Sequence, residues 1–181
     1  VGNCYACFHT YDAEDCRWSV HVFRGAKDVV DSDAEGRSAE MIWNSFGCSL
    51  ESAHAICSMR CFGSTFIEYS ALSYGLQHCF GCVNMRSKKF CILNKPYTEA
   101  AYQKITSEIR DQMRRDGIYG EFFPHAMSPF GYNESSAADE FVLTKDEATG
   151  FGFNWEDYAR GTFGKETIAW DRVPDSIKDI G

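Results

Sequence analysis

Small polar residues recur along the first half of the chain at every twelfth or thirteenth position. Serine fills five of the eight positions in this column, and an apolar or thiol side chain lies three residues before each position. A third column, six residues before the first, is mostly small. The three columns are Cys7, Ser19, Ser32, Ser45, Ser58, Ser70, Cys82 and Asn94; Cys4, Cys16, Val29, Ile42, Ala55, Ile67, Cys79 and Cys91; and Ala13, Ala26, Ala39, Ser52, Ser64, Leu76 and Lys88.

A repeat this short cannot bury a hydrophobic face alone, so its units are expected to stack with equivalent residues in ladders. Segments such as DVV, EMIW, FIEY and FCIL are rich in β-branched and aromatic residues, which favours strands. The pattern therefore predicts a mainly β fold, a parallel β-solenoid over residues 1–95 with the serines in register. The period fits a coil of one repeat or a wider coil of two repeats with two faces. We favour the wider coil, because it houses Trp43, Phe66 and Phe80 better.

The periodicity changes after the segment NKPY, residues 94–97. Thr98 is suited to cap a helix, and an apolar stripe follows at helical spacing until Gly117. We expect this helix to cover the last open coil, because solenoids need a capped end. The stripe consists of Tyr102, Ile105, Ile109 and Met113.

Residues 96–181 are predicted to form this capping helix and an acidic, aromatic arm. Asn133 is predicted to begin a short helix that runs through Phe141, and Thr144 to Glu147 form a capping box. From about residue 150 the chain is Gly-rich without periodicity. We predict that this last part packs on another subunit and buries Trp155 and Trp170 there.

Two cysteine pairs, Cys4 with Cys7 and Cys79 with Cys82, have the spacing of zinc ligands, and His9 and His78 lie beside them. The repeat explains both pairs, since each takes one residue from two columns of the same coil. The pairs lie six repeats apart, so they cannot share one metal. These residues remain weak candidates for metal ligands; we expect structural thiols and no metal or cofactor.

Disulfides are the other alternative for the nine cysteines. Three pairs occupy equivalent positions one repeat apart, and in the tight coil they would be neighbours at about 4.8 Å, within the usual Cα range for a bridge. In the wide coil they would face opposite sides. A reduced protein is the favoured interpretation. The pairs are Cys4 with Cys16, Cys48 with Cys61, and Cys79 with Cys91.

Charge is distributed unevenly between the two parts. Residues 1–95 carry nine basic and ten acidic residues, and residues 96–181 carry nine and sixteen, which together give the net charge of −8. Nucleic acid is a poor partner for such a surface. No apolar run is long enough for a membrane span. The one basic cluster is expected to be solvated or to meet the acidic arm of a neighbouring copy; it consists of Arg86, Lys88, Lys89 and Lys95.

Catalytic motifs are absent: the sequence contains no nucleophile elbow, P-loop, dinucleotide fingerprint or His-Glu-x-x-His. The one candidate for chemistry is a run of carboxylates that could line a solenoid face, as in polysaccharide lyases. Charged outward positions are expected on any coil, so this signal is weak. The run consists of Asp28, Asp31, Asp33 and Glu35.

The run CFGCVNMRSKKFCILNKPYTEAAY, followed by YGEFFP, SPFGYNES and FVLTKDEA, resembles an uncharacterised family of Cys-rich repeat proteins from uncultured bacteria and large phages. The similarity covers roughly residues 77–156 and the earlier repeats more loosely. The resemblance implies a repeat architecture and a link to phage particles, and it implies no catalytic residue.

Two functional hypotheses follow. The first is a non-enzymatic structural or interaction protein, a rigid solenoid subunit of a larger assembly such as a virion or a surface structure, with other protein subunits or further copies as partners. The alternative is a carbohydrate-active β-helix enzyme that uses the carboxylates of residues 28–35. We favour the first hypothesis, because only the carboxylate run points to chemistry. The cellular compartment stays open.

Overall fold

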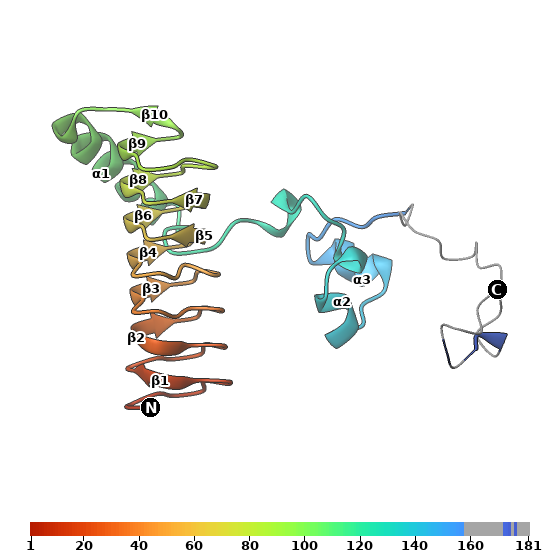
Figure 1. Cartoon of the computed structure of the whole chain (residues 1–181). Coiled ribbons are helices and arrows are strands. Elements are labelled where there is room, and N and C mark those ends of the chain that lie inside the picture. Colours follow the sequence, from red (N-terminus) through yellow and green to blue (C-terminus); the bar gives the residue numbers. More distant parts are fainter. Residues whose placement is uncertain (158–171, 175, 177–181) are drawn as a thin grey trace. The chain divides into compact units, whose positions relative to one another are not determined.

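The computed structural model describes residues 1–157, 172–174 and 176. The chain divides into two compact units, Val1–Phe123 and Pro124–Gly181. The first unit is a stack of short parallel strands, and the second contains short helices (Figure 1). The mainly β solenoid predicted from the repeat is confirmed. No helix in the described ranges is long and apolar enough to cross a membrane.

Each coil of the solenoid consists of a single repeat. Val29 pairs with Ile42, Ile42 with Ala55, and Ala55 with Ile67, each on the adjacent strand in parallel register. The preference for a wider coil of two repeats was therefore wrong. The wider coil was favoured because it would house large aromatic side chains. These side chains lie outside the tube, where Trp43 and Phe66 are 48% and 46% exposed.

Most strands belong to one sheet that runs the length of the stack, in the order β1-β2-β3-β4-β6-β8-β9-β10, and β5 pairs with β7 in a second sheet. All neighbouring strands are parallel except β9 and β10. The strands are β1 (Tyr11–Glu14), β2 (Phe23–Val30), β3 (Glu40–Trp43), β4 (Ala53–Ile56), β5 (Met59–Phe62), β6 (Thr65–Glu68), β7 (Ala71–Tyr74), β8 (Gln77–Phe80), β9 (Lys89–Ile92) and β10 (Lys95–Pro96).

The short coil closes because nearly every third residue has left-handed backbone geometry. Most of these residues precede one that points into the tube, as Asp12 precedes Ala13 and His21 precedes Val22. Asn, Asp and His tolerate this geometry better than other non-glycine residues. The histidines of the solenoid all occupy such positions; they are His9, His21, His54 and His78.

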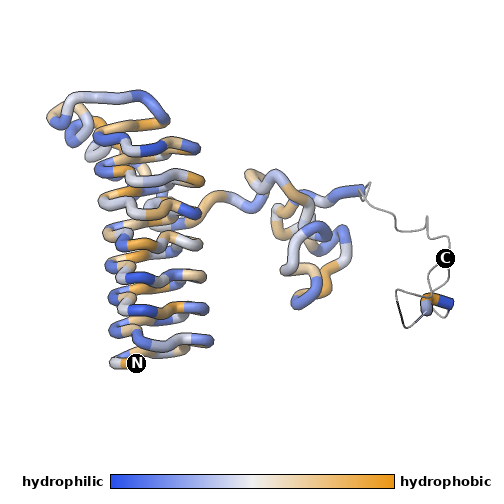
Figure 2. Tube along the Cα trace, in the orientation of Figure 1, coloured by the Kyte–Doolittle hydropathy of each residue, from blue (hydrophilic) through white to orange (hydrophobic). Residues whose placement is uncertain are grey.

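The interior is a narrow tube filled by small and aliphatic side chains and thiols. The predicted serine column lies inside it in register. The main-chain N–H of Ser58 donates to Ser45 Oγ at 3.1 Å, and Ser45 Oγ donates to the carbonyl of Trp43 at 2.9 Å. The same bonds recur from Ser19 through Ser70. Each serine thus satisfies a buried N–H that would otherwise lack an acceptor. Figure 2 shows that hydrophilic and hydrophobic segments alternate along the coils.

Helix α1 (Glu99–Arg115) begins as predicted, with Thr98 Oγ1 accepting from the N–H of Ala101. Its apolar stripe does not lie over the end of the tube. Together with Tyr119 and Phe123 it packs on outward-facing side chains of several coils, among them Tyr69, Phe80 and Ile92. The edge of the last coil is paired instead with the antiparallel strand β10 (Figure 1).

The second unit contains the 3₁₀ helices η1 (His125–Met127) and η2 (Tyr132–Glu134) and the helices α2 (Ala137–Glu140) and α3 (Lys145–Gly150). The capping box of Thr144 and Glu147 is present at α3 as predicted. The helix expected from Asn133 is interrupted, because a 3₁₀ turn contains Asn133 and α2 begins only after Ser136. Trp155 is half-buried, and Trp170 lies outside the described residues.

Candidate interaction surface

The predicted metal-ligand candidates do not converge. Cys79 and Cys82 point into the tube and are fully buried, whereas His78 lies outside it, stacked between the rings of Phe66 and Phe90. Cys4 and Cys7 pack against the interior core at the first coil, and His9 lies on the outer surface. Among the described residues, no group of three or more His, Cys, Asp and Glu side chains has a geometry that could hold a metal ion.

All nine cysteines are free thiols, and all except Cys4 and Cys7 are buried. The tight coil places the predicted cysteine pairs on neighbouring coils, and Cys79 and Cys91 are direct strand partners. A hydrogen bond from the Cys79 thiol lowers the pKa of Cys82 to about 7 and raises the pKa of Cys79 itself. These thiols are enclosed in the core, so they lack the exposure that a reactive cysteine needs.

The four carboxylates of residues 28–35 also lie apart. Asp28 and Asp31 are exposed at successive outward corners of one coil, Asp33 is bound to His21, and Glu35 lies inside the tube. Glu35, inside the tube, therefore does not share a solvent-facing surface with the aspartates outside it.

Glu35 places an ionisable carboxyl group in the interior of the tube, where it is fully buried. Its Oε1 accepts from the N–H of Cys48 at 3.0 Å, and Oε2 has no hydrogen-bond partner. Burial, reinforced by the nearby charge of Asp33, raises the pKa of Glu35 to about 8. The carboxyl group is therefore mostly protonated near pH 7.

A groove of about 400 Å³ lies where α1 meets the solenoid. Its charges are satisfied internally: Arg110 Nε and Nη2 donate to Glu68 at 2.9 and 2.6 Å, and the Tyr119 hydroxyl donates to the same carboxylate at 3.0 Å. The aromatic wall is a column of rings stacked on one another, from His54 through Phe66 to His78. Both ring faces of Phe66 and of His78 are therefore occupied by neighbouring rings.

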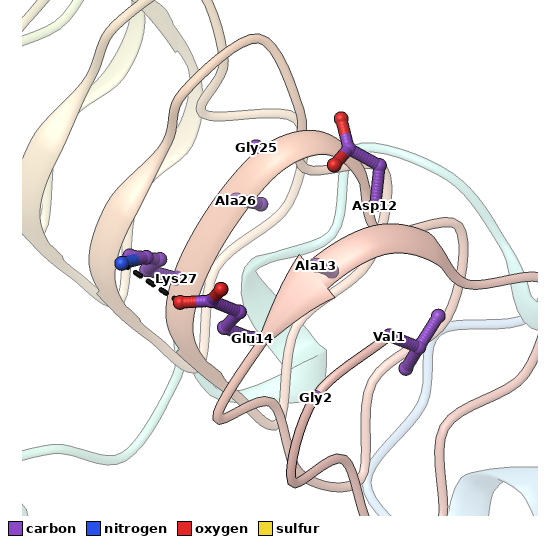
Figure 3. A pocket seen from close by; sticks show the side chains of 8 residues that line it. All are labelled: Val1, Gly2, Asp12, Ala13, Glu14, Gly25, Ala26 and Lys27. Atoms are coloured by element: carbon purple, nitrogen blue, oxygen red, sulfur yellow. Dashed lines mark ion pairs between the residues drawn. The ribbon is translucent and has the colours of Figure 1, made fainter.

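A smaller hollow of about 130 Å³ lies at the first two coils, and Figure 3 shows its lining. Lys27 Nζ and Glu14 Oε2 pair across it at 2.8 Å, as the dashed line marks. Asp12 also lines the hollow, so its lining combines one ion pair with a further carboxylate.

A further groove lies on the outside of the solenoid, and we call it the open groove. It has a volume of about 350 Å³ and two walls built from successive coils. One wall consists of Arg60, Leu72 and Asn84, and the other of Phe62, Tyr74 and Arg86, with Ser73 and Met85 as the floor. The strands hold this arrangement, because Phe62 pairs with Tyr74 and Tyr74 with Arg86 in register.

The open groove combines apolar side chains with positive charge. Leu72 and Tyr74 are about half exposed, at 52% and 46%. The guanidinium groups lie over aromatic rings: that of Arg86 is 5.5 Å from the centre of Tyr74, and that of Arg60 is 5.8 Å from the centre of Phe46. Within the described part of the chain, no acidic side chain lines the groove and neither arginine forms an ion pair.

Sequence reasoning named only Arg86 from this groove, as part of a basic cluster. The missing signal was the coil length: residues 60, 72 and 84 are 12 apart, and so are 62, 74 and 86, which places each set in one column once the tight coil is known. In comparisons with known proteins, no family model, no curated protein and no solved structure matches the chain.

Proposed function

We propose that the protein is a non-enzymatic structural or interaction protein, a rigid solenoid subunit that binds a protein partner through the open groove. The observation that carries this proposal is the presence of two arginines over aromatic rings, beside exposed apolar side chains and with no described acidic residue in the groove. Arginine and aromatic residues are enriched in protein interfaces and among the residues that dominate binding energy. We also propose that the partner belongs to a larger assembly such as a phage particle, as the resemblance of the sequence to Cys-rich repeat proteins implies.

The lining predicts the chemistry of the partner surface. Arg60 and Arg86 favour carboxylates, and Leu72, Tyr74 and Met85 favour an apolar side chain between them. The two arginines stack on aromatic rings, and this contact holds their guanidinium groups in place before binding. Less side-chain entropy is then lost on association. A partner segment that carries acidic residues beside an exposed apolar residue fits this surface.

Site-specific photocrosslinking in the organism that encodes the protein tests the proposal. A photoreactive residue at Leu72 should form an adduct with one defined partner, either another copy or a different protein. Leu93 is the matched control, because it is also an outward leucine with left-handed backbone geometry and is 74% exposed. It should give no such adduct.

A charge-matched pair of variants completes the test. Arg60→Ser with Arg86→Ser should abolish the Leu72 adduct, whereas Arg17→Ser with Arg37→Ser, which removes two charges of the same solenoid outside the groove, should leave it intact. A protein that sediments as a 20.5 kDa monomer in native extracts, without a crosslink at Leu72, would contradict the proposal.

A further inference from the structure

Two histidines lie directly above one another on the outer surface of the first two coils. His9 and His21 are one repeat apart, and both occupy left-handed positions, with φ of 49° and 54°. The N–H of His21 donates to the carbonyl of Phe8 at 3.1 Å, and Phe8 pairs with Val20 across the two coils. The backbone therefore holds both imidazoles in one column.

The spacing of their nitrogens matches that of two ligands on one metal ion. His9 Nδ1 and His21 Nε2 are 3.3 Å apart, with ring centres 5.1 Å apart and planes inclined by 34°. Imidazole nitrogens lie about 2.0–2.1 Å from Zn²⁺, so two nitrogens around a tetrahedral ion are separated by about 3.3–3.4 Å. An ion can thus replace the proton between these nitrogens with little change in their separation.

Asp33, on the next coil, contacts the ring of His21 on the side that faces away from His9. Its Oδ1 lies 2.9 Å from His21 Nδ1, the nitrogen that faces away from His9. A hydrogen bond from Nδ1–H to this carboxylate fixes the tautomer that leaves the Nε2 lone pair directed at His9. Metal-bound histidines usually donate their other ring N–H to a carboxylate, a backbone carbonyl or a water, and this bond orients the ring and increases its basicity.

We propose that His9 and His21 bind a divalent transition-metal ion, with zinc as the expected occupant and Asp33 as the residue that orients His21. The remaining coordination positions face solvent and are taken by water, because the side chains of His21 and Asp33 are 52% and 45% exposed. With two protein ligands, the site binds more weakly than a closed structural zinc site with four. The ion joins the first two coils and stabilises their stacking by mass action.

Isothermal titration calorimetry of the full chain with Zn²⁺, repeated with Ni²⁺, tests this assignment. The half-exposed thiols of Cys4 and Cys7 are replaced by serine in every sample, because thiolates are also zinc ligands. We expect one ion per chain. His9→Asn and His21→Asn should each weaken binding at least tenfold, and asparagine suits their left-handed backbone. Asp33→Asn should weaken it about 10–100-fold.

The chain supplies a matched control. His54 and His78 lie in a similar outward column but are separated by Phe66, so their rings stack on Phe66 and not on each other. His54→Asn and His78→Asn should leave the affinity within about twofold. NMR signals of the His9 and His21 rings should shift on adding Zn²⁺, while those of His54 and His78 stay in place. Binding that survives His9→Asn or His21→Asn, or the absence of binding to the chain in which Cys4 and Cys7 are serine, would overturn the proposal.

Discussion

At the scale of single residues, the solenoid depends on side-chain oxygens that form hydrogen bonds with the buried backbone. A serine inside the tube costs less than its polarity suggests, since its Oγ both donates and accepts within the coil stack. Glu35 is the exception, because one of its oxygens has no partner. We therefore expect the loss of a ladder serine to destabilise the protein, and the replacement of Glu35 by a neutral residue to stabilise it at high pH.

Ser45→Ala should lower the free energy of unfolding by about 1–3 kcal/mol, because the buried N–H of Ser58 loses its acceptor. Chemical denaturation of the two proteins measures the difference. The matched control is Ser87→Ala, at an exposed position outside the ladder, which should change stability by less than about 0.5 kcal/mol. Equal effects at both positions would show that the ladder bonds contribute nothing specific.

Glu35 should make stability depend on pH. Its pKa is raised from 4.5 in the unfolded chain to about 8 in the folded protein, so the folded state holds the proton more tightly. This contribution is complete below about pH 4.5 and is lost as the pH rises through about 8. The total change is about 5 kcal/mol, because each tenfold difference in proton affinity between the folded and unfolded states corresponds to about 1.4 kcal/mol.

Glu35→Gln should remove this dependence and make the protein more stable than the parent at pH 9. Denaturation curves from pH 5 to pH 9 show it as a difference between the two proteins, in which the contributions common to both cancel. The exposed Glu51→Gln is the control and should follow the parent curve. Parallel curves for the parent and Glu35→Gln would contradict the buried-proton account.

At the scale of elements, α1 is held to the side of the solenoid by apolar contacts and one ion pair. Arg110 binds Glu68 with two nitrogens, and Glu68 is only 7% exposed. Removal of one partner from such a pair leaves a charge in a poorly solvated place. The helix therefore depends on this contact more than on its exposed ion pairs.

Arg110→Ala should lower the free energy of unfolding by about 3 kcal/mol, because the Glu68 carboxylate keeps only the Tyr119 hydroxyl as a side-chain partner. Arg114→Ala removes an exposed pair with Asp111 and should cost less than about 1 kcal/mol. Thermal denaturation monitored by circular dichroism compares them. Replacing both Arg110 and Glu68 by leucine should restore most of the lost free energy of unfolding. If it does not, Arg110 contributes through packing and not through the ion pair.

The elements also show how far sequence reasoning reaches. Periodicity predicted the serine ladder, the Thr98 cap and the apolar stripe of α1, because each follows from spacing along the chain. The coil size was predicted wrongly, since the period along the chain fits either one or two repeats per turn. The open groove and the pair of His9 and His21 depend on that choice, so both became visible only with the observed register.

At the scale of the whole molecule, the two compact units divide between Phe123 and Pro124. The predicted parts meet at residue 95, whereas α1 and the segment through Phe123 contribute to a hydrophobic cluster with the solenoid. Folding of the first unit should thus require residues up to 123 and none beyond.

A chain of residues 1–123 should keep the β circular-dichroism spectrum of the solenoid and unfold cooperatively, with a midpoint within about 3 °C of that of the full chain. A chain of residues 1–95 should be much less stable, since it exposes Tyr69, Phe80 and Ile92, which α1 and the following segment cover. If the chain of residues 1–123 is unfolded, folding of the solenoid requires residues of the second unit, and the prediction is wrong.

The constant coil length in the second half of the solenoid has a consequence for how the molecule can change in length. From β4 to β9 the strand partners are 12 residues apart throughout, and each added coil extends the axis by about 4.8 Å. Duplication of a whole coil such as residues 65–76 therefore preserves the ladders, whereas an insertion that is not a whole number of coils shifts the columns out of register. The length of the solenoid is therefore set by the number of repeats that the gene encodes.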